Sequence, residues 1–485
     1  MRYIITALGC KVNQYEAQAV ETLLQEQGFQ PAAEGDPVDL VIVNTCAVTA
    51  EGGRKSRQTI RRLREEHPGA LTAVCGCWSQ LSPEDAQSIG ADVVHGSGDK
   101  HAFVADILKA LEAREFQSFV DDPFQRRVFE SLPAGAVSGR TRAMLKIQDG
   151  CHNFCTYCVI PYTRGRIRSL PLKEIAAQTA ALYAEGYREL VLTGIEIASY
   201  GVDLEGKPNL ADAVVAAAEA APGMRLRLGS LEPTVVTEDF CRAIAATEQV
   251  CDHFHLSLQS GTDRTLARMN RKYDTAAFAA VAERLRRYFP GCALTADLIT
   301  GFPGETEADH AATLAFLRKI AFSQVHVFPY SRRPGTKADA MPEQLTVAVK
   351  SQRAHEAQRA ADETRAAYLS SQLGRTLSVL FETEQDGGWL GHSTNYCTVL
   401  AEGEALRGLV KNVEITGGRA VVQAKAGITE LIEPCGHGQG FRQCADRPEA
   451  SPGKQKRISS RLILKGREVK HLRPRFIRRR GDFLL

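Results

Sequence analysis

The chain has 485 residues, a formal net charge of +3 and 44% hydrophobic residues. This composition is that of an ordinary globular protein of about two to four domains, and it excludes collagen-like and low-complexity proteins. No segment approaches the roughly 18 uninterrupted apolar residues of a membrane helix, so we expect a cytoplasmic protein without a membrane partner. The 13 cysteines are spread over a long chain, unlike the dense disulfide framework of a small secreted domain.

The N-terminal region alternates between strand and helix patterns. Apolar strands are predicted at 2–8, 38–44, 70–76 and 91–96, with helices at 14–29 and 54–66. Nearly continuous apolar strands separated by helices indicate a doubly wound parallel sheet in an α/β domain. We assign this domain to residues 1–112 and a linker to residues 113–136.

A cysteine follows each of the first three predicted strands: Cys10, Cys46 and Cys77. Ligands of open α/β sheets gather outside the carboxyl ends of the strands, so we expect these cysteines to converge on one site. The alternative for each is a small buried side chain that only packs. Cys75 falls inside the third strand and is predicted to pack rather than to bind.

Six further strands alternate with helices in the central region, which we assign to residues 137–367. They are predicted at 143–148, 189–194, 225–230, 253–259, 294–301 and 324–330. Six such units indicate a partial (β/α)6 barrel, whose chemistry is expected at the carboxyl ends of the strands.

The C-terminal region changes character again. After a polar helix at about 344–372, short strands with glycine-rich turns predict a small β-barrel over residues 370–433. Residues 434–485 form a tail of unknown role, and 451–485 contain 12 Lys and Arg against 2 Asp and Glu. Such a tail either binds nucleic acid or is simply solvated.

Three cysteines lie within eight residues in "CHNFCTYC", residues 151–158, directly after the first central strand. A structural zinc site needs four Cys or His ligands, and no fourth ligand pair follows at zinc-finger spacing. In a [4Fe–4S] cluster, three thiolates leave one iron open to a small molecule. An iron–sulfur cluster therefore fits the motif better, with zinc as the alternative.

This Cys-x3-Cys-x2-Cys loop after a barrel strand resembles the signature of the radical S-adenosylmethionine superfamily. The resemblance implies a [4Fe–4S] cluster on Cys151, Cys155 and Cys158, with S-adenosylmethionine chelating the open iron. It also implies an external electron donor, such as a flavodoxin or ferredoxin, and cleavage of the cofactor to a 5′-deoxyadenosyl radical.

Other segments of the central region resemble parts of the superfamily's cofactor site. "LTGIE" is a variant of a Gly-Gly-Glu segment that holds the methionine amine, although the glycine doublet is incomplete, and "GFPGET" resembles a glycine-rich element near adenine and ribose. Two polar residues on the fourth central strand are either cofactor contacts or satisfied buried groups. The cofactor-binding residues implied in this way are Tyr157, Gly194, Glu196, Ser257, Gln259, Gly301, Pro303, Gly304 and Glu305.

The upstream cysteine trio, the radical core and the small β-barrel resemble, in this order, the methylthiotransferase family over residues 1–433. The resemblance implies a second [4Fe–4S] cluster on Cys10, Cys46 and Cys77, and an RNA-binding TRAM domain at the C-terminus. "LGCKVNQYE" is most similar to members that act on N6-threonylcarbamoyladenosine next to the tRNA anticodon. Isopentenyladenosine enzymes usually read Gln-Met-Asn after this cysteine, and ribosomal-protein enzymes read Pro-Lys-Asn.

The implied reaction places a methylthio group on C2 of that adenosine. A radical abstracts the unactivated hydrogen, the second cluster supplies sulfur, and a second S-adenosylmethionine supplies the methyl group. No catalytic acid or base is expected beyond the cluster ligands. The alternatives are an enzyme for isopentenyladenosine in tRNA, one for a ribosomal-protein aspartate, and a non-enzymatic zinc protein that binds RNA.

Arginines follow the cysteine motif at alternate positions: Arg164, Arg166 and Arg168. In an extended segment they would share one face and suit phosphates or the threonylcarbamoyl carboxylate of a tRNA anticodon stem-loop. The alternative is a loop with surface arginines. Further RNA candidates are the basic helix at 54–66 and, in the terminal barrel, Trp389 and Tyr396.

Overall fold

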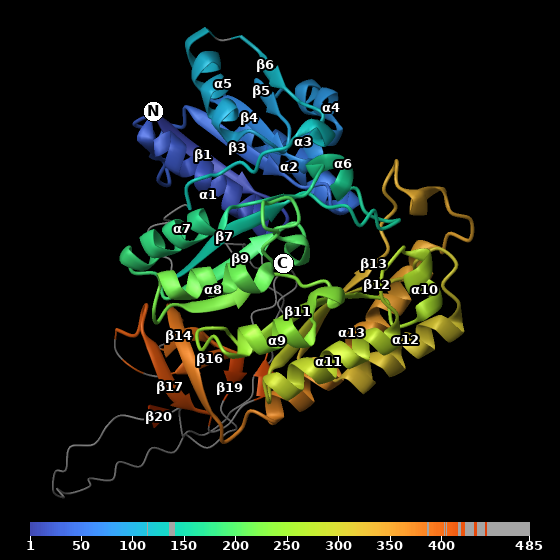
Figure 1. Ribbon diagram of the computed structural model, residues 1–485. Coiled ribbons are helices and arrows are strands. Elements are labelled where there is room, and N and C mark those ends of the chain that lie inside the picture. The colour runs from blue at the N-terminus through green and yellow to red at the C-terminus, as the bar shows by residue number, and fades with distance from the viewer. Residues whose placement is uncertain are drawn as a thin grey trace, which may run out of the picture.

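The computed structural model describes residues 1–113, 115–134, 141–385, 388–401, 403 and 405–415, with the strands at 419–421, 431–433 and 442–443. Three sheet-containing parts are stacked in chain order, from the N-terminal part at the top of Figure 1 to the C-terminal sheet at the bottom. Apart from 442–443, the predicted tail at 434–485 lies outside the described residues. No described helix is long and apolar enough to cross a membrane.

The N-terminal sheet has six parallel strands in the order β2-β1-β3-β4-β5-β6. They are β1 (Arg2–Ala7), β2 (Gln30–Pro31), β3 (Leu40–Thr45), β4 (Leu71–Gly76), β5 (Val93–His95) and β6 (Gln117–Phe119). The four strands predicted from the sequence are all present. The sixth comes from the segment predicted as linker, so the sheet continues past residue 112.

Helices cover both faces of this sheet, which explains why its strands are apolar on both sides. On one face lie α1 (Lys11–Glu26) and α5 (Lys100–Ala113), and on the other α2 (Ala50–Glu66), α3 (Cys77–Leu81) and α4 (Pro83–Ser88). Leu40 and Ile42 of β3 pack on the first face, while Val41 and Val43 pack on the second. Cys75 is buried in β4 among the first group, as predicted.

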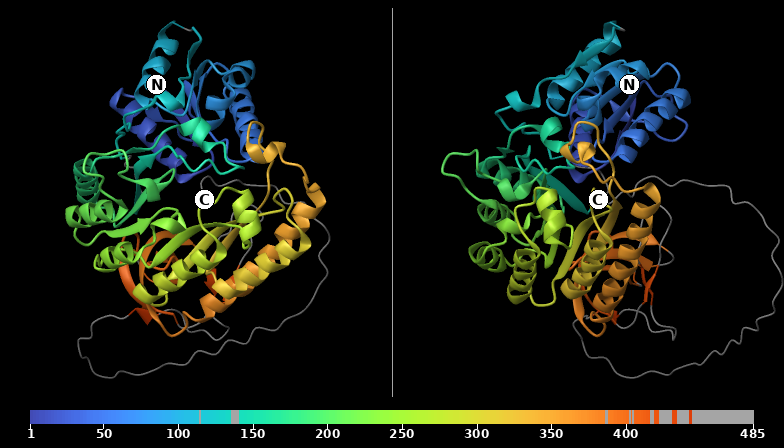
Figure 2. Two further views of the ribbon diagram at one scale, coloured as in Figure 1. Left: turned by 45° about the vertical axis from the view of Figure 1, so that its right-hand side comes forward. Right: turned by 90° about the vertical axis from the view of Figure 1, so that its right-hand side faces the viewer.

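The central part contains six parallel strands in chain order, with helices on their outer side (Figures 1 and 2). The strands are β7 (Arg142–Asp149), β9 (Glu189–Gly194), β10 (Arg225–Leu228), β11 (His253–Gln259), β12 (Ala293–Thr300) and β13 (Gln324–Pro329). The helices are α6 (Ile160–Arg164), α7 (Leu172–Ala184), α8 (Leu210–Ala220), α9 (Glu238–Ala245), α10 (Asp263–Arg268), α11 (Thr275–Tyr288) and α12 (Glu307–Ile320).

These strands form two sheets, β10-β9-β7-β8 and β11-β12-β13, where β8 (Arg168–Ser169) runs antiparallel to β7. Isolated parallel bridges such as Leu226 to Val250 connect the sheets. The predicted partial barrel is therefore confirmed. Tyr15 and Ala19 of α1 belong to its core, so the N-terminal part packs directly on it.

The C-terminal part is antiparallel. After α13 (Val347–Ser370), its strands are β14 (Thr376–Gln385), β15 (Gly388–Ser393), β16 (Thr398–Ala401), β17 (Val410–Glu414), β18 (Arg419–Val421), β19 (Leu431–Glu433) and β20 (Arg442–Gln443). Five of them form one sheet in the order β16-β15-β14-β17-β20, and β18 pairs with β19 separately. The prediction of short strands is confirmed, and they pair in antiparallel fashion, while their closure into a TRAM barrel stays a prediction.

This C-terminal sheet docks on the amino ends of the central strands. Glu189, the first residue of β9, pairs with Arg225 and Arg227 of β10, at 2.7 Å from Arg227 Nε. The same arginines donate hydrogen bonds to the carbonyls of His392 and Ser393, each at 3.1 Å. The carboxyl ends of the central strands are therefore left for contact with the N-terminal part.

Of the two aromatic residues considered for RNA stacking, Tyr396 contributes to this docking and Trp389 packs against the core of the C-terminal sheet. Tyr396 stacks on His253 and His392, with ring centroids 4.8 and 5.0 Å apart, and Arg227 lies over its ring. The interpretation of Tyr396 as a free stacking platform is wrong, because the central strands already cover its ring.

Candidate active site at the carboxyl ends of the strands

The first cysteine trio meets at one edge of the N-terminal sheet. Cys10 precedes α1, Cys46 follows β3, and Cys77 opens α3 directly after β4. The three thiols lie close enough to raise one another's pKa, and the packing around them is tight at Gly9. At Gly9, where φ is +90°, a side chain would place its Cβ 2.5 Å from Cys46 Sγ. Glycine is thus required where the backbone passes the thiol.

The second trio lies on the loop between β7 and α6. Cys151, Cys155 and Cys158 are half-buried, and none of the described cysteines forms a disulfide. Asn270 secures the loop by donating hydrogen bonds to the carbonyls of Asn153 and Phe154, both at 3.1 Å. The three cysteines therefore sit on a braced loop and remain partly accessible.

Burial sets the protonation of these thiols in the free protein. It raises the pKa of Cys46 to about 12 and that of Cys158 to about 12. A metal centre must displace such protons, because the thiolate is the ligand form. Over the described residues, no group of three or more His, Cys, Asp or Glu could hold a metal ion. In an iron–sulfur cluster, unlike at a single metal ion, each thiolate binds a different iron atom. Three soft sulfur donors at each site fit such a cluster.

Arg164 connects the two trios. It ends α6, six residues after Cys158, and its side chain is fully buried. Its Nε donates a hydrogen bond to Cys77 Sγ at 3.3 Å, and one terminal nitrogen donates to Asn13 Oδ1 at 2.9 Å. Both terminal nitrogens also contact the carboxylate of Glu16. The loop of one trio is thereby tied to a thiol of the other.

A buried set of ion pairs surrounds this connection. Lys146 Nζ lies 3.0 Å from Glu16 and 3.3 Å from Asp149, and Arg168 lies 3.3 Å from the same Asp149. Burial alone would raise the pKa of Glu16, but Arg164 and Lys146 lower it to about 2. The acidic and basic side chains of this set thus neutralise one another at the contact between the N-terminal and central parts.

The predicted shared face of three arginines is wrong. Arg164 is the last residue of a helix and Arg168 begins the strand β8, so the segment is not extended throughout. Both are buried, whereas Arg166 is exposed and donates a hydrogen bond to the Phe124 carbonyl at 3.0 Å. Of the three, only Arg166 is accessible to a substrate.

Two of the predicted cofactor elements lie together. The Tyr157 ring is edge-to-face with Phe302, with centroids 6.5 Å apart, so it meets the "GFPGET" loop. Gly301 and Gly304 take φ values of +71° and +75° there, and Pro303 lies between them. Glu305 braces this loop: its carboxylate pairs with Arg353 at 2.9 Å and accepts the Gly301 amide at 3.0 Å. Its charge is therefore already compensated within the protein.

The other predicted cofactor residues line neighbouring strand ends. The Glu196 amide donates to Gln148 Oε1 at 2.7 Å, and burial raises the pKa of the Glu196 carboxyl to about 7. A Cβ on Gly194 would lie 2.7 Å from the Gln148 carbonyl oxygen, which explains the glycine. Ser257 and Gln259 are half-buried on β11, at a register irregularity where Gln259 has a φ of +62°.

Comparison with known proteins agrees with this arrangement. The Radical SAM superfamily model matches residues 145–317, and Uncharacterized protein family UPF0004 matches residues 2–96. The threonylcarbamoyladenosine tRNA methylthiotransferase MtaB of Bacillus subtilis is 37% identical over 416 residues, which cover 84% of this chain and 92% of that protein. The chain belongs to the methylthiotransferase family of radical SAM proteins.

Other relatives of this methylthiotransferase chain carry two different names. The MtaB protein of Thermotoga maritima is 37% identical, covering 78% of this chain and 86% of the relative. The tRNA-2-methylthio-N(6)-dimethylallyladenosine synthase of Syntrophomonas wolfei is also 37% identical, covering 73% and 80%. Among solved structures, the radical S-adenosylmethionine methyltransferase TsrM of Kitasatospora setae has a TM-score of 0.52 at 16% identity, covering 70% of this chain and 74% of that one. This likeness shows the fold alone.

Two residues of the methylthiotransferase site were not singled out from the sequence. Arg271 donates a hydrogen bond to Cys155 Sγ at 3.1 Å, lies 3.4 Å from the Tyr157 hydroxyl and pairs with Glu232. The negative charge of Glu232 in turn contributes to the raised pKa of the Glu196 carboxyl. Neither residue belongs to a periodic pattern. Glu232 directly follows the strand predicted at 225–230, which could have suggested it, whereas Arg271 follows no predicted strand.

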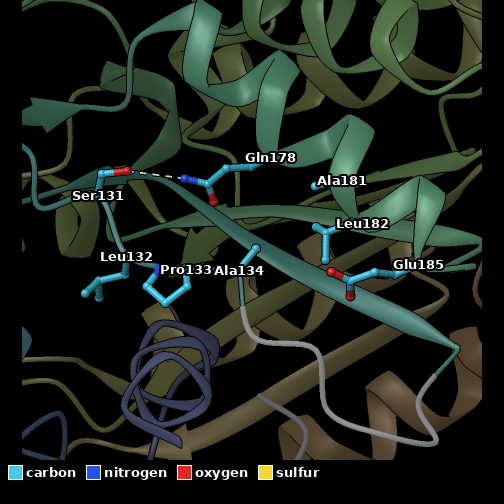
Figure 3. Close-up of a pocket in the computed structure, with 8 residues that line it drawn as sticks. All are labelled: Ser131, Leu132, Pro133, Ala134, Gln178, Ala181, Leu182 and Glu185. Atoms are coloured by element: carbon cyan, nitrogen blue, oxygen red, sulfur yellow. Dashed lines mark hydrogen bonds between the residues drawn. The ribbon is translucent and has the colours of Figure 1, made fainter. Parts of the chain in front are cut away.

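The structure also contains a pocket of about 340 Å³ away from the cysteines. It lies between α7 and residues 131–134, and Figure 3 shows Gln178 donating to the Ser131 hydroxyl, at 3.3 Å, across it. None of the predicted site residues lines it. It is therefore separate from the candidate active site.

Proposed function

We propose that this protein is a tRNA methylthiotransferase that adds a methylthio group to C2 of N6-threonylcarbamoyladenosine beside the anticodon. The observation that carries the proposal is the joining of two cysteine trios through Arg164, which follows one trio and contacts Cys77 of the other. An enzyme that combines radical formation with sulfur insertion needs two such centres close together. The relatives named for threonylcarbamoyladenosine support the substrate, as does the Lys-Val-Asn-Gln that follows Cys10.

In this proposal Cys151, Cys155 and Cys158 hold one [4Fe–4S] cluster, and Cys10, Cys46 and Cys77 hold the second. When loaded, the site supplies a 5′-deoxyadenosyl radical from S-adenosylmethionine and a methylthio group for C2. The protein's own contribution is orientation and exclusion of water.

Individual side chains have distinct tasks toward S-adenosylmethionine. Tyr157 and the loop of Gly301, Pro303 and Gly304 offer an apolar wall for the adenosine, and Glu196 offers a carboxylate for the methionine amine. Ser257 and Gln259 are proposed as polar contacts. Glu305 acts indirectly, because its pairing with Arg353 fixes the loop.

The tRNA is proposed to approach from the outside of the N-terminal and C-terminal parts. Arg166 is exposed beside the cysteine loop, and α2 exposes Lys55 and Arg61. The antiparallel C-terminal sheet is proposed as the TRAM domain, since small β-domains bind single strands and loops. An external one-electron donor completes the system.

Nucleoside mass spectrometry of tRNA tests the proposal. A strain that lacks the gene should lose 2-methylthio-N6-threonylcarbamoyladenosine and accumulate the form without the methylthio group. The wild-type gene should restore the modification, and the Cys77→Ala gene should not. Loss of the methylthio mark from isopentenyladenosine, or from a ribosomal protein, would instead assign one of the alternative substrates.

Anaerobic reconstitution tests the cofactors separately. Two clusters predict roughly eight irons per chain and a brown charge-transfer absorption. Stoichiometric zinc without iron would support the non-enzymatic RNA-binding alternative.

A further inference from the structure

The loop that follows β13 spans the space between the two cysteine trios. The Ser331 hydroxyl, near the start of this loop, accepts a hydrogen bond at 3.0 Å from the amide of Ala50, the first residue of α2. Farther along, the Ala338 amide donates a hydrogen bond at 2.8 Å to the carbonyl of Thr156, which lies within the loop of the second trio. Figure 2 shows the loop after β13 reaching the N-terminal part.

The first turn of α2 also borders the first trio. A Cβ on Gly52 would lie 3.2 Å from Cys46 Sγ, so this turn passes close to that thiol. Because Ser331 is bound to the same turn, Arg333, two residues later, is brought to this side of the N-terminal part. Burial lowers the pKa of Arg333, nearby Cys46 counteracts this shift, and nearby Arg57 of α2 adds to it.

Arg57 approaches the same region from α2. Its guanidinium group lies over the ring of Trp78, 5.8 Å from the centroid. Trp78 is buried and directly follows Cys77 of the first trio. Two arginines, one from α2 and one from the loop after β13, therefore converge beside this trio.

Neither arginine has an anionic partner within the described part of the chain. The Nε atom of Arg333 is buried without a hydrogen-bond acceptor, and Arg57 takes part in no ion pair there. Their neighbours on the same two segments, Arg54 and Arg332, donate to carboxylates at 2.7 and 2.8 Å. Two like charges in a partly desolvated place are unfavourable by themselves, which indicates a site that an anion completes.

A bound target nucleotide would bring such an anion. In the proposed reaction C2 of the adenine receives sulfur at the first trio, so the rest of the nucleotide lies within a few bonds of that place. The nucleotide has a backbone phosphate on each side and, in N6-threonylcarbamoyladenosine, a carboxylate. Both groups are oxyanions, which a guanidinium group binds through parallel N–H donors.

We propose that Arg57 and Arg333 form a binding site for an oxyanion of the target nucleotide. The flanking phosphates and the threonylcarbamoyl carboxylate share this chemistry. The inference rests on the proposed function, because that function brings a nucleotide to the first trio. It moves the oxyanion contact away from Arg164 and Arg168, since both are buried in ion pairs.

Binding of anticodon stem-loop RNAs to the reconstituted enzyme tests the inference. One RNA carries N6-threonylcarbamoyladenosine, a second carries its carboxylate methyl ester, and two more carry a methylphosphonate in place of the 5′ or 3′ phosphate of that nucleotide. Fluorescence anisotropy at one fixed salt concentration gives each Kd, because salt changes every RNA affinity. Arg57→Met and Arg333→Met should each bind the unaltered RNA about tenfold more weakly than the wild type, which corresponds to about 1.4 kcal/mol.

The three neutralised RNAs identify the anion. The RNA that lacks the bound charge should bind the wild type about tenfold more weakly than the unaltered RNA does. With this RNA, the wild type and Arg333→Met should have equal affinity, whereas the other two RNAs should keep the difference. Equal affinity for the neutralised RNA, together with an unchanged iron content and visible absorption spectrum, shows that the variant is folded.

Arg54→Met and Arg332→Met are the matched controls, since each removes an arginine of the same segment that already pairs with a carboxylate. Both should bind the unaltered RNA like the wild type. Wild-type affinity in Arg57→Met and Arg333→Met would overturn the inference. So would a loss that persists with all three neutralised RNAs, or an equally large loss in the two controls.

The proposed function and the oxyanion site can fail separately. A wild-type enzyme that methylthiolates the threonylcarbamoyl RNA, while both arginine variants bind it normally, would remove only the site. Methylthiolation of an isopentenyladenosine RNA in its place would overturn the proposed substrate. The site would then stand only if a methylphosphonate abolishes the difference between the wild type and Arg333→Met.

Discussion

Replacing Arg164 with Met should destabilise the folded protein, and not merely weaken its contact with RNA. The guanidinium group is fully buried and contacts Glu16, Asn13 and Cys77. Removal of one partner from a buried ion pair costs about 3–5 kcal/mol, because the other charge stays buried without compensation. Lys146 remains 3.0 Å from the Glu16 carboxylate and keeps part of the compensation. We therefore expect a loss near the lower end, about 3 kcal/mol.

Urea unfolding followed by tryptophan fluorescence measures this loss. The chain has two tryptophans, and Trp78 lies in the N-terminal part next to Cys77. In a Trp389→Phe background, Trp78 alone reports on the region that Arg164 stabilises. The midpoint should move to lower urea with an unchanged slope, as for a pure change in stability.

Arg166→Met is the matched control, since it removes the same side chain two positions away from an exposed site. Its effect on unfolding should stay within about 0.5 kcal/mol, as for other surface substitutions. If both variants unfold like the wild type and both weaken tRNA binding alike, the buried ion pair would be refuted and the three-arginine clamp restored.

Other substitutions separate the roles of the remaining site residues. Cys77→Ala should abolish methylthiolation but leave cleavage of S-adenosylmethionine, and Cys155→Ala should abolish both activities. The modified nucleoside measures the first activity and 5′-deoxyadenosine the second. Cys75→Ala, inside β4, should abolish neither. Arg271→Met should lower cofactor cleavage and change the electron paramagnetic resonance spectrum of the reduced cluster, because it removes a donor 3.1 Å from Cys155 Sγ; an unaltered spectrum would contradict this contact. Tyr396→Ala should loosen the C-terminal sheet by about 1–2 kcal/mol, since aromatic and cation–π contacts are lost, and limited proteolysis after α13 should become faster.

The strands and the first cysteine trio could be predicted from the sequence because their signals are local. Each N-terminal strand is a short apolar run, and a cysteine after such a run is placed by the strand itself. Parallel strands then bring their carboxyl ends to one edge, so Cys10, Cys46 and Cys77 meet although 36 and 31 positions separate them. No knowledge of distant contacts was needed.

The arginines were misjudged because their burial depends on such distant contacts. Arg164 finds Glu16 across 148 positions of sequence, and α6 is only five residues long, too short to show a periodic pattern. Arg271 meets Glu232 across 39 positions for the same reason. Alternating arginines are consistent with an exposed extended face until the partner carboxylates are located, and only the tertiary structure locates them.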